Sequence, residues 1–130
     1  MMRMKSGCSG DAPPAALLVD LESDRAVLSD ALARAGYRVS RCATALEAIH
    51  QVEQGQTAVL ISALYLAHLT GTELAGVARR LNPSMIIVLV AGDHDRIPKE
   101  AALRAGANTL LTRPLRVEAV LQSLTPVPRS

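Results

Sequence analysis

The side chains that could do chemistry stand where short apolar runs of the sequence end. Asp20, Ala63, Val90 and Arg113 each close such a run or follow it directly. Asp20 could hold a metal ion or pair with Arg113, and we expect the ion pair because no other acid is aligned to share a cation. Ala63 ends the central run, and its methyl group cannot act as a nucleophile. Of these four residues, therefore, only Asp20 and Arg113 carry side chains that can take part in chemistry.

Five apolar runs are expected to form strands, with a helix after each. The runs cover residues 16–20, 37–42, 58–63, 85–91 and 108–112. Apolar residues recur at helical spacing within residues 24–35, 44–54, 72–81, 98–105 and 116–124. Ser23-Asp24 offers an N-cap for the first helix, and Asp93 to Asp95 is expected to form a polar loop. Thr44 and Glu47 predict a capping box, and Pro98 is expected in the first turn of its helix. The alternation predicts a parallel α/β sheet, whose ligands bind at the carboxyl ends of the strands.

The length and composition set further limits. The 130 residues allow one domain, which we place at 15–124. Residues 1–14 are expected to be a flexible tail, and residues 125–130 a tail or the start of a linker. Only Tyr37 and Tyr65 are aromatic, so the core must be aliphatic, and the stacking platforms of single-stranded nucleic-acid binders are missing.

Charge and cysteine usage exclude several partners. The formal charge is +2 and the basic residues are scattered, so no nucleic-acid partner is expected. Cys8 and Cys42 fit neither a disulfide framework nor a metal site. There is no apolar stretch of about 18 residues and no secretory signal pattern, so we expect a cytoplasmic protein without a membrane partner. His68 and His94 are expected to be exposed loop residues.

Five short fragments, taken in order, resemble the receiver domain of two-component response regulators. They are Leu-Leu-Val-Asp at 17–20, Ala-Gly-Tyr-Arg-Val at 35–39, Leu-Thr-Gly-Thr-Glu-Leu at 69–74, Ala-Gly-Ala-Asn at 105–108 and Leu-Thr-Arg-Pro-Leu at 111–115. Each fragment is weak alone, but their order and spacing together are specific. The resemblance covers roughly residues 15–124. It implies a flavodoxin-like (βα)5 domain with a five-stranded parallel sheet of order 2-1-3-4-5 and helices on both faces.

The resemblance also assigns the phosphorylation pocket. Two adjacent acids normally hold Mg²⁺ after the first strand, and here they read Asp20-Leu21. Glu22 is a poor geometric substitute. The acceptor aspartate lies eight residues before the loop glycine, and counting back from Gly71 gives Ala63. Ser62 precedes that position and should point to the opposite face of its strand.

The remaining family positions also differ from the usual pattern. The hydroxyl residue that contacts the phosphoryl group is Val90, the lysine is Arg113, and the aromatic switch residue is Leu110. Pro114 follows Arg113, and the peptide bond between them is expected to be cis, as in the family. With Asp20 as the one aligned carboxylate, Mg²⁺ binding should be weak or absent. We expect no cofactor and no enzymatic activity.

The leading hypothesis is a non-phosphorylatable receiver-like module of a bacterial two-component or related pathway, acting through protein–protein contacts. Its partners would be a histidine kinase or a fused effector domain. A homodimer is expected to use the last two helices and the fifth strand, near Arg104, Arg113 and Arg116. Two alternatives stay open. One is an ordinary phosphorelay receiver in which engineering replaced the acceptor aspartate by Ala63, and the other is a small flavodoxin-like ligand-binding protein.

Overall fold

The computed structural model of the chain describes residues 14–67, 69–92, 95 and 98–124. The expected tails, except for Pro14, and the two loop histidines His68 and His94 lie outside these residues. The expected strands and helices all form. The strands are β2 (Ala15–Val19), β3 (Arg38–Cys42), β4 (Thr57–Ala63), β5 (Ile86–Ala91) and β6 (Thr109–Thr112). The helices are α2 (Arg25–Arg34), α3 (Ala45–Glu53), α4 (Gly71–Leu81), α5 (Lys99–Ala105) and α6 (Val117–Leu124), with a short 3-10 helix η1 at Glu22–Asp24.

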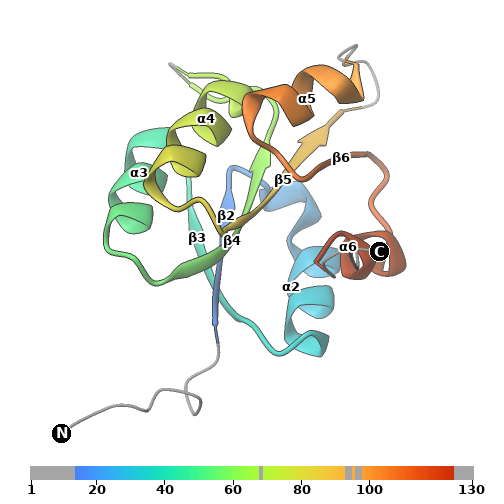
Figure 1. Cartoon of the computed structure of the whole chain (residues 1–130). Helices are drawn as coiled ribbons and strands as arrows, with labels where there is room; N and C mark the ends of the chain where they lie inside the picture. The colour runs from blue at the N-terminus through green and yellow to red at the C-terminus, as the bar shows by residue number, and fades with distance from the viewer. Residues whose placement is uncertain (1–13, 68, 93–94, 96–97, 125–130) are drawn as a thin grey trace, which may run out of the picture.

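All five strands are parallel and lie in the order β3-β2-β4-β5-β6 (Figure 1). Counted along the chain this is 2-1-3-4-5, which confirms the predicted fold. β3 and β6 are the edges, and β4 lies in the centre. All residues of β2 are buried, and in β4 only Ala58 is partly exposed. Burial on both faces explains why β2 reads as an unbroken apolar run and why residues 58–63 of β4 are apolar except for Ser62.

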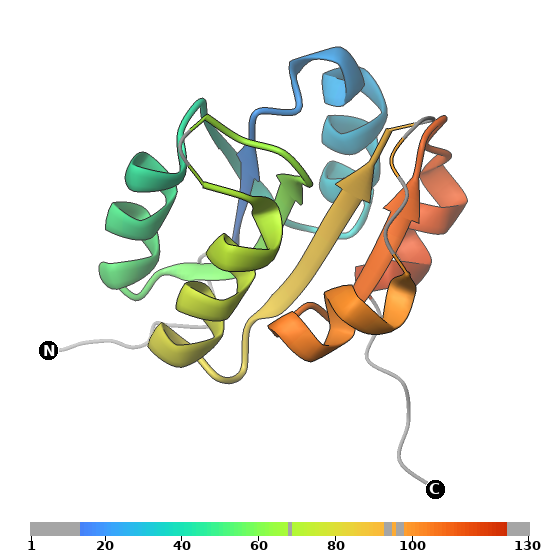
Figure 2. The ribbon, with the colours of Figure 1, turned by 90° about the horizontal axis from the view of Figure 1, so that it is seen from above.

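The helices form one layer on each face of the sheet, as the two views show (Figures 1 and 2). On one face, α3, α4 and α5 contribute buried side chains to a cluster with Leu17, Leu60 and Leu89. On the other, α2 and α6 form a second cluster with Leu18 and Ile61. Both clusters are aliphatic. Within the described residues, no helix is long and apolar enough to cross a membrane.

The starts of four helices differ from the expected ones in their first residue or their capping. α4 begins at Gly71 because Thr70 and Glu73 form a reciprocal capping box. At α3 the box is incomplete, since Glu47 accepts from the N–H of Ala43 and the Thr44 hydroxyl but not from the Thr44 N–H. Pro98 is the N-cap of α5 and not a first-turn residue. Before α2, the chain first forms η1.

One arginine side chain forms hydrogen bonds to the loops at the amino-terminal ends of β5 and β6. The guanidinium of Arg79, on α4, donates to the carbonyl oxygens of Pro83, Met85 and Gly106 and to Oδ1 of Asn108, at 2.7–3.0 Å. Its planar fork can serve several acceptors at once, which a lysine cannot do. Arg79 therefore joins α4 to the loops before β5 and β6.

Candidate functional site

The centre of the site is the end of β4, where Ala63 and Leu64 meet the start of α4. The Leu64 N–H donates to the Val90 carbonyl at 2.9 Å, and the Gly71 N–H donates to the Leu64 carbonyl at 2.6 Å. A Cβ on Gly71 would lie 2.4 Å from the Ala63 carbonyl oxygen, so only glycine allows this approach. The glycine that located Ala63 in the sequence is thus in direct contact with it.

The side chain of Ala63 belongs to the apolar core on the α2–α6 face of the sheet. Leu21, Ala63, Val90 and Leu115 belong to the same buried cluster, each 9% exposed or less. They come from four different segments that converge at the carboxyl ends of the strands. None of the four carries a side-chain donor, acceptor or charge. The structure therefore extends the α2–α6 core up to the edge where ligands of such sheets bind.

Arg113 pairs with Asp24, so the predicted Asp20–Arg113 ion pair is wrong. Nε of Arg113 lies 2.8 Å from Oδ2 of Asp24, and the two side chains are 29% and 12% exposed. Asp24 was expected to cap α2, but its side chain makes no capping hydrogen bond. The pair joins the loop after β6 to the start of α2.

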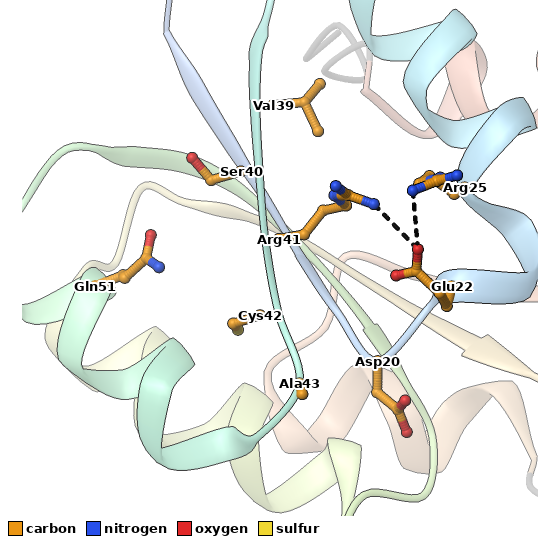
Figure 3. A pocket seen from close by; sticks show the side chains of 9 residues that line it. All are labelled: Asp20, Glu22, Arg25, Val39, Ser40, Arg41, Cys42, Ala43 and Gln51. Carbon is orange, nitrogen blue, oxygen red and sulfur yellow. Dashed lines mark hydrogen bonds and ion pairs between the residues drawn. The ribbon is translucent and has the colours of Figure 1, made fainter.

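Asp20 has an uncommon backbone conformation. Its φ is 53°, a left-handed conformation that aspartate tolerates better than most residues. Its N–H donates to the Cys42 carbonyl at 3.0 Å. The carboxylate is exposed and lies beside β3, pointing away from Glu22 (Figure 3).

The carboxylate of Glu22 forms ion pairs with two arginines. Its Oε2 atom lies 3.1 Å from Nη1 of Arg25 and 3.0 Å from Nη1 of Arg41 (Figure 3). Glu22 therefore lies with Arg41 on the α2 side of β3, and its carboxylate does not lie beside that of Asp20. Among the described residues, no three His, Cys, Asp or Glu side chains are grouped so as to hold a metal ion.

Ser62 lies on the opposite face from Ala63, as its position in the strand predicted. It is fully buried, and its hydroxyl donates to the Ala63 carbonyl at 2.8 Å. The thiol of Cys42 is also half-buried, and burial, aided by the charge of Glu47, raises its pKa to about 11. Neither group is an activated nucleophile in this environment.

The remaining predicted positions lie in and around β6. The Arg113–Pro114 peptide bond is cis, as expected. Leu110 is partly buried against the α3–α5 cluster. Arg104 on α5 and Arg116 before α6 are exposed, whereas Arg113 is held by Asp24.

Sequence reasoning missed two acids at this edge. One is Asp24, which looked like a helix cap. The other is Asp95, whose Oδ2 accepts from the Gly92 N–H at 2.6 Å. A Cβ on Gly92 would lie 3.5 Å from Nη1 of Arg113, so the guanidinium lies close to this loop. The polar stretch after β5 was a signal for a loop, but nothing in it indicated that contact.

The sequence profile of the response regulator receiver domain matches residues 17–125. The chain belongs to this family. The match begins within β2 and runs through all later strands and helices, and the solved receiver domains share its fold. A receiver domain from Methanospirillum hungatei superposes with a TM-score of 0.75 at 25% identity, covering 87% of this chain and 91% of that one. A response regulator from Chloroflexus aurantiacus gives 0.75 at 28% identity, covering 85% and 93%.

A curated relative places such a domain inside a longer protein. The C4-dicarboxylate transport transcriptional regulatory protein DctD of Rhizobium meliloti is 27% identical over 113 residues. This alignment covers 86% of the present chain and 25% of the relative. The chain thus spans about a quarter of the length of the relative that it matches.

Proposed function

We propose that this receiver domain does not accept a phosphoryl group and acts in signalling through protein contacts. The observation that carries the proposal is the buried cluster of Leu21, Ala63, Val90 and Leu115. In receivers, the first three of these positions hold a metal-binding acid, the acceptor aspartate and a hydroxyl. Phosphoryl transfer needs an oxygen nucleophile in line with the donor, and no side chain of the cluster supplies one.

The acids present do not fit a receiver magnesium site. Mg²⁺ requires near-octahedral oxygen coordination, usually with one or two carboxylates. The Asp20 carboxylate points away from that of Glu22, Asp24 is bound to Arg113, and Glu22 is bound to two arginines. We therefore expect weak or absent Mg²⁺ binding, no cofactor and no enzymatic activity.

As a receiver domain, the chain has signalling proteins such as kinases or phosphotransfer proteins as its expected partners. We propose a cytoplasmic location and a regulatory contact that does not depend on phosphorylation. Exposed Arg104 and Arg116 remain candidates for a dimer surface on α5, β6 and α6. In the same proposal, a fused effector domain is the alternative partner to a histidine kinase.

The test is an amide NMR titration with Mg²⁺ and beryllofluoride, which imitates a phosphoryl group on an aspartate. We expect no amide chemical-shift changes for the chain or for Ala63→Asp. Leu21 and Val90 still occupy the positions of the metal-binding acid and the hydroxyl. The triple variant Ala63→Asp, Leu21→Asp, Val90→Thr should respond if it folds, and its circular dichroism gives that control.

A response of Ala63→Asp alone would favour the alternative, an ordinary receiver whose acceptor was removed by engineering. Labelling of the unaltered chain by acetyl phosphate, located by mass spectrometry in this pocket, would refute the proposal.

A further inference from the structure

The outer edge of β3 has open backbone groups. β3 pairs with β2 on one side, and no described strand lies on its other side. The Arg38 N–H donates to the Pro14 carbonyl, and the Cys42 carbonyl accepts from the Asp20 N–H. In a parallel ladder the backbone groups of alternate residues point to the same side. Arg38, Ser40 and Cys42 therefore face β2, and the N–H and C=O groups of Val39 and Arg41 face outward.

The N–H groups of Tyr37 and Ala43, on either side of this segment, already have acceptors within the domain. The Tyr37 N–H donates to the Leu32 carbonyl at 2.9 Å. The Ala43 N–H donates to Oε1 of Glu47 at 3.2 Å. The free edge is therefore confined to Val39 and Arg41, a length that suits a short extended peptide and not a long sheet extension.

A hollow of about 830 Å³ follows the same edge. Val39 and Arg41, on the α2 side of the strand, line it together with Ser40 and Cys42, on the α3 side. Because both faces of β3 contribute, the hollow runs around its outer edge. Figure 3 shows Arg25 and Arg41 on the α2 side, and Ser40 and Gln51 on the other.

The charges of β3 itself favour a negatively charged occupant, because Arg38–Cys42 holds two arginines and no acid. In the lining of the hollow, Asp20 and Glu22 balance the charges of Arg25 and Arg41. Arg25 and Arg41 share a single carboxylate oxygen of Glu22, and their side chains are 55% and 46% exposed. Arg38 is exposed on the same strand. Exposed ion pairs contribute little stability, so an incoming carboxylate can replace Glu22 at either guanidinium.

We propose that the β3 edge binds an extended acidic segment of a partner protein as an added strand. The segment would exchange main-chain hydrogen bonds with Val39 and Arg41. Its acidic side chains would meet Arg25 and Arg41, and the alternate side chains would meet Ser40 and Gln51. The inference rests on the proposed function, since it names a partner and a surface for the protein contacts proposed there.

A second copy of the chain is a poor occupant of the same edge. Pairing β3 with β3 would join two strands that each carry two arginines and no acid, and like charges on neighbouring strands are destabilising. Charged side chains commonly protect edges from such self-pairing. The same arginines attract a strand of opposite charge.

The probe is a fluorescein-labelled peptide of four Thr-Glu repeats, measured by anisotropy against a peptide of four Thr-Lys repeats. We expect the acidic peptide alone to bind and to slow hydrogen exchange at the amides of Val39 and Arg41. Arg41→Glu should weaken binding by about tenfold or more. Arg25→Glu provides a second charge reversal outside the strand. Arg34→Glu, the same change on α2 at an arginine paired with Asp30, should leave binding unchanged.

Peptides with N-methyl groups on all Glu or on all Thr residues separate strand pairing from charge attraction. We expect one of them to lose binding and the other to keep it, because alternate amides of an added strand face β3. Equal behaviour of the two methylated peptides, equal binding to Arg34→Glu and Arg41→Glu, or no protection of Val39 would overturn the inference.

Protection that appears without peptide and grows with protein concentration would assign the edge to a second copy and also overturn the inference. None of these outcomes changes the response to beryllofluoride, so failure here is distinguishable from failure of the proposed function.

Discussion

Replacing Gly71 by alanine should damage the domain more than any other glycine-to-alanine change in a helix. The new Cβ would lie 2.4 Å from the Ala63 carbonyl oxygen and 3.1 Å from Cα and O of Leu64. All three atoms belong to the backbone, so no side-chain rotation relieves the clash. Either the end of β4 or the start of α4 must move by nearly 1 Å. Overpacking of this kind costs about 2–3 kcal/mol of unfolding free energy.

Gly76→Ala is the matched control on the same helix. Its Cβ would meet only the Ala105 carbonyl oxygen, at 3.4 Å, which is ordinary van der Waals contact. Alanine is favoured over glycine inside a helix by about 0.5–1 kcal/mol, so this variant should be slightly more stable than the parent. The two substitutions therefore have effects of opposite sign.

Urea unfolding followed by circular dichroism measures both variants. The free energies of unfolding should differ by about 3 kcal/mol, and with a slope near 2 kcal/mol/M the midpoints differ by about 1.5 M. Equal midpoints, or a Gly71→Ala variant as stable as the parent, would refute the reasoning that the β4–α4 approach is closed to a side chain.

Three further predictions concern single side chains. Arg79→Met should lower the free energy of unfolding by about 3 kcal/mol, because several backbone acceptors lose a charged donor at once, whereas Arg80→Met on the exposed side should change it by less than about 0.5 kcal/mol in the same urea experiment. Because the pKa of Cys42 is raised to about 11 from 9.0, unfolding free energy should fall as pH rises from about 9 to 11, and Cys42→Ala should flatten that dependence. Hydrogen bonds from Thr70 lower the pKa of Glu73, so its carboxyl should titrate by NMR below its usual pKa of 4.5 and move back toward it in Thr70→Ala. The capping contribution of that carboxylate is present at neutral pH and is lost as pH falls through its lowered pKa.

The fold was predictable because local and global signals agree. The run of β2 is apolar throughout, since helices cover both faces of the sheet. The strand order came from the family resemblance. Helix starts were harder to place. Thr70 and Glu73 formed the reciprocal box, while Thr44 and Glu47 formed only part of one. The same sequence pattern gave two geometries, and the two N-cap residues differ in φ, which is −128° at Thr44 and −83° at Thr70.

At the site, spacing was informative and pairing was not. Counting from Gly71 located Ala63 correctly on the strand end, because the close backbone approach fixes that distance along the chain. Arg113 pairs with Asp24 of the 3-10 helix that follows β2, whereas Asp20 at the strand end adopts a left-handed backbone with a φ of 53°. The sequence gives no sign of this positive φ, because the residue is an aspartate and not a glycine.

The packing of α6 on α2 has a consequence for synthesis on the ribosome. α3, α4 and α5 follow one another along the chain, so the core on their face can close step by step. The opposite face stays open until the end, because Leu28 and Leu32 of α2 share their cluster with Val120 and Leu124 of the last helix. A nascent chain therefore carries an uncovered aliphatic surface until residues 117–124 emerge, and this half of the domain is where aggregation during translation would begin.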